Sequence, residues 1–405
     1  MPAWESQTLD GGVTAAEGFA AAAVHCGIKP DPDRLDLALL WSARPCVAAG
    51  VFTRNRAAAA PVKYDQSRLQ APPRDGFRAI VVNSGIANAA TGARGLRDAE
   101  QMAKAAATAL GIAPGQVLVC STGVIGRPLP LDRIEGGIAA ASRALARENG
   151  ALAARAIMTT DTRPKESAYR LTAAAGSFVV GGMAKGAGMI EPNMATMLAF
   201  LTTDLPVPAP LLAAWLRWAA DQSFNRITID HDTSTNDTVL MLAPQGDGAR
   251  PGRAMAAAAR EAILAVCRDL ARKIVEDGEG VTRVVTVRVT GGRTQRQALA
   301  AARQIANSPL IKCSWHGADP NWGRIVAAVG NSGAEFRLDR LAVHYGDVTA
   351  VRDGVDAGAA RAGLRAACAR PAWTLTVDLG AGTARGEIVG CDLSSEYVKV
   401  NTGES

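Results

Sequence analysis

Short apolar runs rich in β-branched residues recur along the chain, and Gly, Asn, Asp or Pro bounds most of them. We expect these runs to be strands, because such residues suit the pleated, half-buried surface of a sheet. The runs cover residues 78–83, 116–120, 177–180, 238–242, 283–289 and 373–379.

Alanine-rich segments lie between these runs and predict helices. In the last segment Ile263, Val266 and Leu270 follow the spacing of a helix that buries one face. We expect helices at 97–110, 132–156, 211–221 and 253–275. Strands that alternate with helices indicate an α/β protein built in layers.

Two shorter segments carry local signals. Residues 319–324 predict a turn and a helix start with Asp319 at the cap. Residues 397–401 predict a final strand that ends at Asn401.

A chain of 405 residues exceeds one ordinary core and suggests two to three lobes. The first thirty residues lack the basic start and apolar centre of a signal peptide. No run approaches the eighteen apolar residues of a membrane span. We therefore expect a cytoplasmic protein without a membrane segment.

Composition disfavours several classes of protein. The 7 cysteines and 4 histidines lack CxxC or metal-ligand spacing, so we expect neither a disulfide framework nor a metal site. The net charge of +6 is dispersed, which argues against nucleic-acid binding. No Gly-rich nucleotide motif connects a strand to a helix, so nucleotide binding is disfavoured.

The most informative stretch is residues 185–198, where a Gly-rich loop with Lys185 leads through Thr196 into an apolar run. A cut before Thr196 would give this threonine a free α-amine, whose pKa is about 7.7–8.0 in peptides. A threonine with its own N-terminal amine is a known pair of nucleophile and base. The alternative is a plain loop that enters a buried strand.

Four other polar segments could line a site, and each has a structural alternative. Residues 120–126 can aim a hydroxyl and a backbone N–H at one point, as an oxyanion hole requires, or form an ordinary turn. Residues 159–165 gather three hydroxyls and a carboxylate, or only stop a helix before Pro164.

The other two segments follow the same logic. Asx and Ser/Thr turns explain residues 232–238 adequately, and we favour that structural interpretation. In residues 277–280, Glu279 either holds an ammonium group or follows a helix C-cap into solvent.

Together, these motifs resemble those of the ornithine acetyltransferase family of arginine biosynthesis, some members of which are also N-acetylglutamate synthases. The resemblance runs essentially end to end. The matching segments are 48–55, 82–85, 120–126, 159–165, 185–198, 223–238, 277–280, 308–312 and 319–324.

The resemblance implies a precursor that cleaves itself between Ala195 and Thr196. The products would be an α chain of residues 1–195 and a β chain of residues 196–405, assembled as α2β2 or larger. The implied fold is an αββα-like arrangement, similar to N-terminal nucleophile hydrolases but with different connectivity.

The resemblance also implies roles for single residues. Thr196 would accept the acyl group with its own amine as base, while Thr122 and Gly123 stabilise the oxyanion. The implied substrate-binding residues are Thr159, Lys185, Thr196, Glu279, Asn401 and Ser405.

The implied reaction is ping-pong. N-acetylornithine would give its acetyl group to Thr196, ornithine would leave, and glutamate would take the acetyl group. One amide replaces another, so no metal or cofactor is required. The sequence leaves open whether acetyl-CoA is a further donor.

The chain departs from the family pattern at Ile86, where Asn is usual, at His231, where Gly is usual, and in its short tail ending at Ser405. A self-cleaving hydrolase of the β-aminopeptidase type is an alternative, as is a paralogue that acetylates a related amino acid. A relative without activity is disfavoured, because the catalytic set is intact.

Overall fold

Apolar, β-branched runs form a mixed sheet of 9 strands in the first of the two units into which the chain divides. The computed structural model describes residues 4–173, 176–191, 197–246 and 251–402. The first unit spans residues 1–225 and 232–274, and the second spans 226–231 and 275–405.

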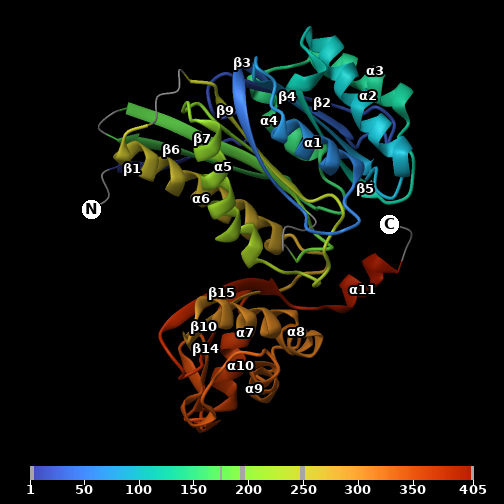
Figure 1. Ribbon diagram of the computed structural model, residues 1–405. Coiled ribbons are helices and arrows are strands. Elements are labelled where there is room, and N and C mark those ends of the chain that lie inside the picture. The colour runs from blue at the N-terminus through green and yellow to red at the C-terminus, as the bar shows by residue number, and fades with distance from the viewer. Residues whose placement is uncertain (1–3, 174–175, 192–196, 247–250, 403–405) are drawn as a thin grey trace. The chain divides into compact units, whose positions relative to one another are not determined.

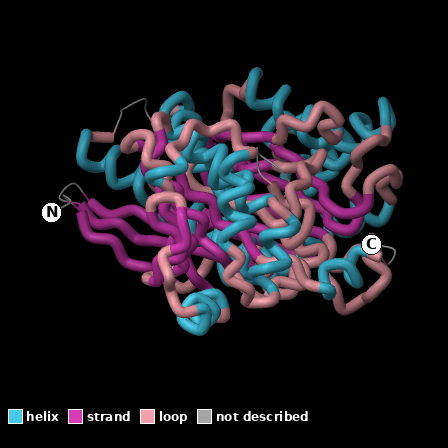
Figure 2. Tube along the Cα trace, turned by 90° about the horizontal axis from the view of Figure 1, so that it is seen from below, coloured by secondary structure: helices cyan, strands magenta, loops and turns pink. Residues whose placement is uncertain are grey.

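The strands of the first unit occur in the order β1-β6-β7-β8-β9-β3-β4-β5, with β2 paired to β3. Two neighbouring pairs, β4–β5 and β8–β9, are parallel, and the other pairs are antiparallel. The strands are β1 (Trp4–Leu9), β2 (Phe19–Val24), β3 (Leu37–Phe52), β4 (Phe77–Ile86), β5 (Val117–Val124), β6 (Lys165–Ala173), β7 (Gly176–Lys185), β8 (Leu198–Thr203) and β9 (Thr238–Pro244). Figure 1 labels them, and Figure 2 shows the β1 side of the sheet in magenta beside the N-terminus.

Strand β3 is 16 residues long and folds this sheet over on itself. Its first part, Leu37–Trp41, pairs with β4, and its last part, Cys46–Phe52, pairs with β9. The pairing register shifts between Trp41 and Cys46. The two parts of β3 therefore belong to two layers of strands.

One apolar core joins side chains from both layers. Leu40 and Leu118 come from one layer, and Met183, Phe200 and Leu240 come from the other. On the opposite side of β3 and β4, Leu39 and Val81 pack with helices. This alternation of burial along each strand is what places a core between the layers.

Helices cover the outer faces of the two layers (Figure 1). Met102 and Ile138 from α2 and α3 pack in the cluster that contains Leu39. Val266 and Leu270 of α6 approach β7 at Gly182. The helices of this unit are α1 (Ala60–Gln70), α2 (Gly92–Leu110), α3 (Leu131–Arg143), α4 (Gly150–Ala156), α5 (Ala209–Asp221) and α6 (Arg253–Glu276).

The second unit has its own mixed sheet of 6 strands in the order β13-β12-β11-β14-β10-β15. Its core includes Trp315, Tyr345 and Trp373, with the Tyr345 and Trp373 rings stacked at 5.4 Å. The strands are β10 (Val284–Gly292), β11 (Ala342–Tyr345), β12 (Val348–Arg352), β13 (Val355–Asp356), β14 (Ala372–Asp378) and β15 (Ala384–Cys391). The helices are α7 (Gln295–Asn307), α8 (Pro309–His316), α9 (Trp322–Gly330), α10 (Arg361–Cys368) and α11 (Ser395–Asn401).

The α/β class expected from the sequence is confirmed, and the six apolar runs predicted as strands overlap observed strands. The prediction of one helix at 132–156 is wrong, because this segment forms two helices, α3 and α4, with a break between them. Ala146 is extended there and exchanges two 3.0 Å backbone hydrogen bonds with Ala21 of β2. Pairing with a strand overrides the local preference for helix.

Two local predictions near the C-terminus are also wrong. The expected strand at 397–401 is helix α11, because the Ser394 side chain caps it by accepting from the Tyr397 N–H. The cap of α9 is Asn321 rather than Asp319, whose carboxylate instead receives the Arg361 side chain.

In the part of the chain that the structure describes, every helix is too short or too polar to cross a bilayer.

The core between the layers predicts a large cost for removing Leu40, which is 1% exposed. We expect Leu40→Ala to lower the free energy of unfolding by about 2–5 kcal/mol, through lost burial and a residual cavity. Urea titration followed by circular dichroism measures this. The matched control is Leu152→Ala on α4, where the leucine is 38% exposed and the expected change is within about 0.5 kcal/mol. Equal costs for the two variants would contradict the placement of this core.

Candidate functional site

Thr122 and Gly123, predicted to form an oxyanion-binding turn, instead lie in the last residues of strand β5, where they pair with Ser84 and Gly85 of β4. Gly123 has a φ of +129°, and a Cβ atom there would lie 2.2 Å from the carbonyl carbon of Gly85 on β4. No other residue fits so close an approach at that φ. The preceding Thr122 is buried, so its hydroxyl and the Gly123 N–H belong to one tightly packed end of this strand.

Lys185 is the last residue of β7, and its side chain reaches Thr122 from the other layer of strands. Its Nζ donates to the Thr122 Oγ1 at 3.3 Å, and the lysine is 4% exposed. Strand β5 is not a neighbour of β7 in the sheet. The contact therefore depends on the two layers facing one another.

Asp161 connects Lys185 with the polar segment at 159–165. One oxygen of its carboxylate, Oδ1, accepts from the Lys165 Nζ and the Gly186 N–H, both at 2.6 Å. The other oxygen, Oδ2, accepts from the Thr159 N–H at 3.0 Å. The structure thus brings two predicted substrate-binding residues, Thr159 and Lys185, to one buried carboxylate.

The charges around Asp161 decide its protonation state. Burial alone would raise the pKa of this carboxyl, but Lys185, Lys165 and the Gly186 N–H outweigh burial and lower the pKa to about 2. Asp161 is therefore ionised at neutral pH. It supplies the negative charge that allows two lysines to be buried nearby.

A third buried lysine holds the backbone before Thr159. The Lys29 Nζ donates to the carbonyls of Leu35 at 2.7 Å and Met158 at 2.8 Å. Burial, followed by the charge of Arg34, lowers the pKa of Lys29 to about 8. Arg34 also donates to the Thr159 carbonyl. Thr159 is thus held at both its N–H and its carbonyl.

The polar loop at 232–238 holds two elements of the site at once. Asn236 donates from its Nδ2 to the carbonyl of Ser121 at 2.8 Å, one residue before Thr122. The next residue, Asp237, accepts the Met197 N–H at 2.8 Å through its Oδ1. Adjacent side chains therefore fix the end of β5 before Thr122 and the backbone that leads into β8.

The second unit holds the remaining described residues of the predicted set. Asn401 on α11 donates from its Nδ2 to the Glu279 Oε2 at 2.8 Å. Gly280 follows with a φ of +65°, and a Cβ there would lie 2.5 Å from the Tyr397 backbone nitrogen. Glu279 and Asn401 are therefore hydrogen-bonded to one another, next to the close packing of Gly280 against the backbone of α11.

Three predicted residues, Ala195, Thr196 and Ser405, lie outside the described residues. Their predicted roles are not tested by the geometry. Met197, which is bonded to Thr196, is described and is 2% exposed.

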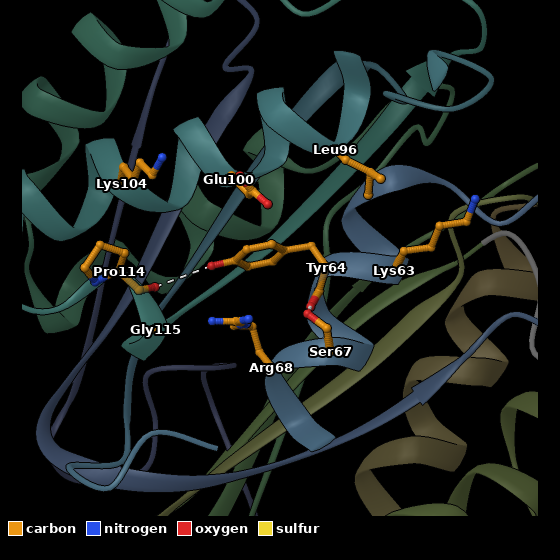
Figure 3. Close-up of a pocket in the computed structure, with 9 residues that line it drawn as sticks. All are labelled: Lys63, Tyr64, Ser67, Arg68, Leu96, Glu100, Lys104, Pro114 and Gly115. Atoms are coloured by element: carbon orange, nitrogen blue, oxygen red, sulfur yellow. Dashed lines mark hydrogen bonds between the residues drawn. The ribbon is translucent and has the colours of Figure 1, made fainter. Parts of the chain in front are cut away.

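A separate cavity of about 420 Å³ lies between α1 and α2. Figure 3 shows the side chains that line it. The Tyr64 ring lies in it, and the Tyr64 hydroxyl is 3.5 Å from the carbonyl of Val117 at the start of β5. Thr122 is five residues further along this strand, about 17 Å at a rise of about 3.3 Å per residue. The cavity therefore lies at the other end of β5 and is not part of the site. Its basic lining residues are Lys63, Arg68 and Lys104.

A comparison with known protein families identifies the family of this chain. The model of the ArgJ family matches residues 20–403. The chain belongs to the ArgJ family. The expectation drawn from the sequence motifs is thereby confirmed, and the chain is an enzyme of this family.

Relatives match the chain over nearly its full length. The arginine biosynthesis bifunctional protein ArgJ of Symbiobacterium thermophilum is 48% identical over 97% of this chain and 98% of its own. The protein of the same name from Dehalococcoides mccartyi is 45% identical over 97% and 96%. A solved ornithine acetyltransferase from Mycobacterium tuberculosis, in complex with ornithine, is 42% identical over 48% of this chain and 100% of that one, with a TM-score of 0.43.

Sequence reasoning missed the residues that support the site. The sequence explains Asn236 and Asp237 as turn residues and gives Asp161 no role of its own within the polar cluster at 159–165. Each of the three is buried and bonds to a residue next to a predicted catalytic or binding position. The available signal was a dense polar run between two apolar segments. Such a run needs buried hydrogen-bond partners if it does not lie on the surface.

His231 shows why one departure from the family pattern is tolerated. Its φ is +69°, in the left-handed region where the family's usual glycine has no strain. The His231 Nδ1 is 2.8 Å from the Asn307 Nδ2, a contact that glycine cannot make.

The ionised state of Asp161 predicts a pH-dependent stability. Its pKa is lower in the folded chain than in the unfolded chain, so its contribution is present above about pH 4 and is lost as the pH falls through about 2. We expect Asp161→Asn to be less stable than the wild type at pH 7. The difference in the free energy of unfolding between the wild type and Asp161→Asn should fall by about 2 kcal/mol between pH 7 and pH 2. Urea titration at each pH measures it.

The exposed Asp339, whose pKa is also lowered by its partner Arg337, serves as the matched control. Asp339→Asn should leave stability almost unchanged throughout. A gap for Asp161→Asn that does not vary with pH would contradict the ionised buried carboxylate.

Proposed function

We propose that this chain is a self-cleaving acetyltransferase that moves the acetyl group of N2-acetylornithine to glutamate through acetyl-Thr196. One observation carries the proposal. Asn236 and Asp237, adjacent in sequence, hold the backbone beside Thr122 and the backbone beside Thr196. Membership of the ArgJ family supports the same chemistry.

Cleavage is the first step of the proposed activity. The Thr196 hydroxyl attacks the Ala195 carbonyl, the peptide C–N bond breaks, and the nitrogen leaves as the α-amine of Thr196. Water then hydrolyses the ester between Ala195 and Thr196. The products are the α chain, residues 1–195, and the β chain, residues 196–405.

Acyl transfer then uses the new amine as the base. The Thr196 Oγ forms a bond to the acetyl carbonyl while its proton passes to the amine. The C–N bond of N-acetylornithine breaks, and the leaving nitrogen takes that proton. The same steps in reverse order transfer the acetyl group to the amine of glutamate.

The oxyanion of each tetrahedral intermediate needs donors that are already in place. The Thr122 hydroxyl and the Gly123 N–H fill this role in the proposal. The close packing of Gly123 on Gly85 supports it, because donors fixed by backbone contacts need no reorganisation during the reaction.

Substrate recognition follows from charge. Lys185 suits the α-carboxylate shared by ornithine and glutamate derivatives, and Glu279 suits an ammonium group. Thr159, Asn401 and Ser405 complete the proposed binding set. No metal or resident cofactor is needed, acetyl-CoA is a candidate second donor, and cytoplasmic α2β2 or larger assemblies fit the proposal.

The intact mass of the denatured protein after brief exposure to N-acetylornithine tests this function. We expect two fragments split between Ala195 and Thr196, with the C-terminal fragment heavier by one acetyl group. Acetyl-CoA in place of N-acetylornithine tests the second donor in the same way.

Two variants control this experiment. Thr196→Ala should give one uncleaved chain without an acetyl group, because the nucleophile is gone. Thr203→Ala removes another buried hydroxyl of the same segment and should leave cleavage intact. A wild-type chain that stays in one piece would overturn the proposed function. Cleavage without acetylation, together with net release of acetate, would favour the hydrolase alternative.

A further inference from the structure

Asp237 combines deep burial with an incomplete set of partners. The residue is 0% exposed, and its Oδ1 accepts the Met197 N–H at 2.8 Å. Its Oδ2 makes no hydrogen bond of good geometry with a described residue, because the nearby Thr53 hydroxyl donates to the Ser234 carbonyl instead. A buried carboxyl with an unsatisfied oxygen costs stability, so an ordinary turn does not account for it.

The backbone around Asp237 is held as firmly as its side chain. Its carbonyl accepts the N–H of Thr53, the residue after β3, at 2.9 Å, and the Thr238 N–H donates to the Met197 carbonyl at 3.1 Å. Met197 is therefore bound at both its N–H and its carbonyl by two consecutive residues of one segment. The start of β8 is fixed in both directions along the strand.

Asn236 holds the end of β5, before the predicted oxyanion donors, in a similar way. Its Nδ2 donates to the carbonyls of Ala87 at 2.6 Å and Ser121 at 2.8 Å. The residue after Ser121 is Thr122, and the residue before Met197 is Thr196. One rigid dipeptide, Asn236–Asp237, thus spans from the predicted oxyanion donors to the predicted nucleophile.

We propose that Asp237 is a positioning residue, which holds the Met197 amide and thereby sets the attack geometry of the residue bonded to it. This inference rests on the proposed function, because it assigns the nucleophile to position 196. Asp237 acts through Met197 and takes no proton from the substrate.

The role requires a hydrogen-bond acceptor rather than a charge. Burial raises the pKa of Asp237 well above its usual range, and the Met197 N–H and the charge of Lys185 oppose this effect. The carboxyl offers Oδ1 to the Met197 N–H in either protonation state. Asparagine offers the same oxygen at the same place, so it should replace aspartate here.

Asp65 provides a matched control in the same unit. It is also 0% exposed, and its Oδ1 accepts a strand N–H, that of Val119, at 2.8 Å. Burial also raises the pKa of Asp65 well above its usual range. Its hydrogen bond lies in the body of β5, three residues before Thr122, rather than next to residue 196.

The experiment compares Asp237→Ala, Asp237→Asn, Asp65→Ala and Asp65→Asn in the full chain. The rate of self-cleavage is followed by intact mass, kcat and KM are measured on the cleaved enzyme, and urea titration reports stability. We expect Asp237→Ala to lower both the cleavage rate and kcat by about 100-fold, because small displacements of a reacting group have effects of that size. KM should stay within about threefold of the wild type.

Asp237→Asn should restore the cleavage rate and kcat to within about tenfold of the wild type, since the acceptor is retained. The free energy of unfolding of Asp65→Ala should fall by as much as that of Asp237→Ala. Its kcat, in contrast, should stay near that of Asp65→Asn. If the alanine variant does not fold, Asp237→Glu takes its place. Glutamate moves the acceptor by one methylene and should lower kcat without changing KM.

Three outcomes would overturn the inference. They are a wild-type kcat in Asp237→Ala or Asp237→Glu, a change confined to KM, and an Asp237→Asn variant as inactive as Asp237→Ala, which would mean that the charge is needed. Failure of the proposed function is recognised separately, because the wild-type chain itself would then remain uncleaved.

Discussion

Strand β3 is the constraint on which the rest of the first unit depends. Its two parts pair with β4 and with β9, and the register shift between Trp41 and Cys46 lets the strand change layers. Pro45 lies within this break, where a missing backbone donor costs no ladder hydrogen bond. In a flat sheet β5 and β7 would be about 24 Å apart, at about 4.8 Å per strand. The folded sheet brings Thr122 and Lys185 to within 3.3 Å instead.

Bringing the strand ends together in a buried place creates an electrostatic cost, and Asp161 offsets it. Removing a charge from water is expensive unless a partner and further hydrogen bonds compensate. Lys165 lies 2.6 Å from Asp161, and the Gly186 and Thr159 N–H groups bind the same carboxylate. The positive charge of Lys185 can then be buried beside Thr122 at the end of β5. The loop after β7 and the segment after α4 are thus coupled by one carboxylate, and a change at either one disturbs the other.

Helices and strands could be predicted from the sequence where local patterns determine them. They could not be predicted where pairing with a distant segment determines them. The apolar runs of β4, β5 and β9 follow their own composition, and the motifs at Thr122 and Lys185 were found as candidate chemistry. The break at Ala146 depends on Ala21, more than a hundred residues away, and no local signal reports it. Asp161, Asn236 and Asp237 were missed for a related reason. Their residue types suit turns, and only burial shows that their partners are the backbone beside the site.

The burial that fixes the start of β8 also suits the chemistry proposed for it. All described residues of β8 are buried, and Met197 before them is 2% exposed. In the proposed function, the new α-amine belongs to the residue bonded to this buried segment, and burial of an amine disfavours its charged form and lowers its pKa. An ionised carboxylate nearby would oppose this by stabilising the ammonium. Because burial raises the pKa of Asp237, that opposing charge is reduced. In the proposed function, Asp237 therefore holds the start of β8 through its acceptor oxygen and, with its pKa raised, adds less negative charge near the amine that acts as the base.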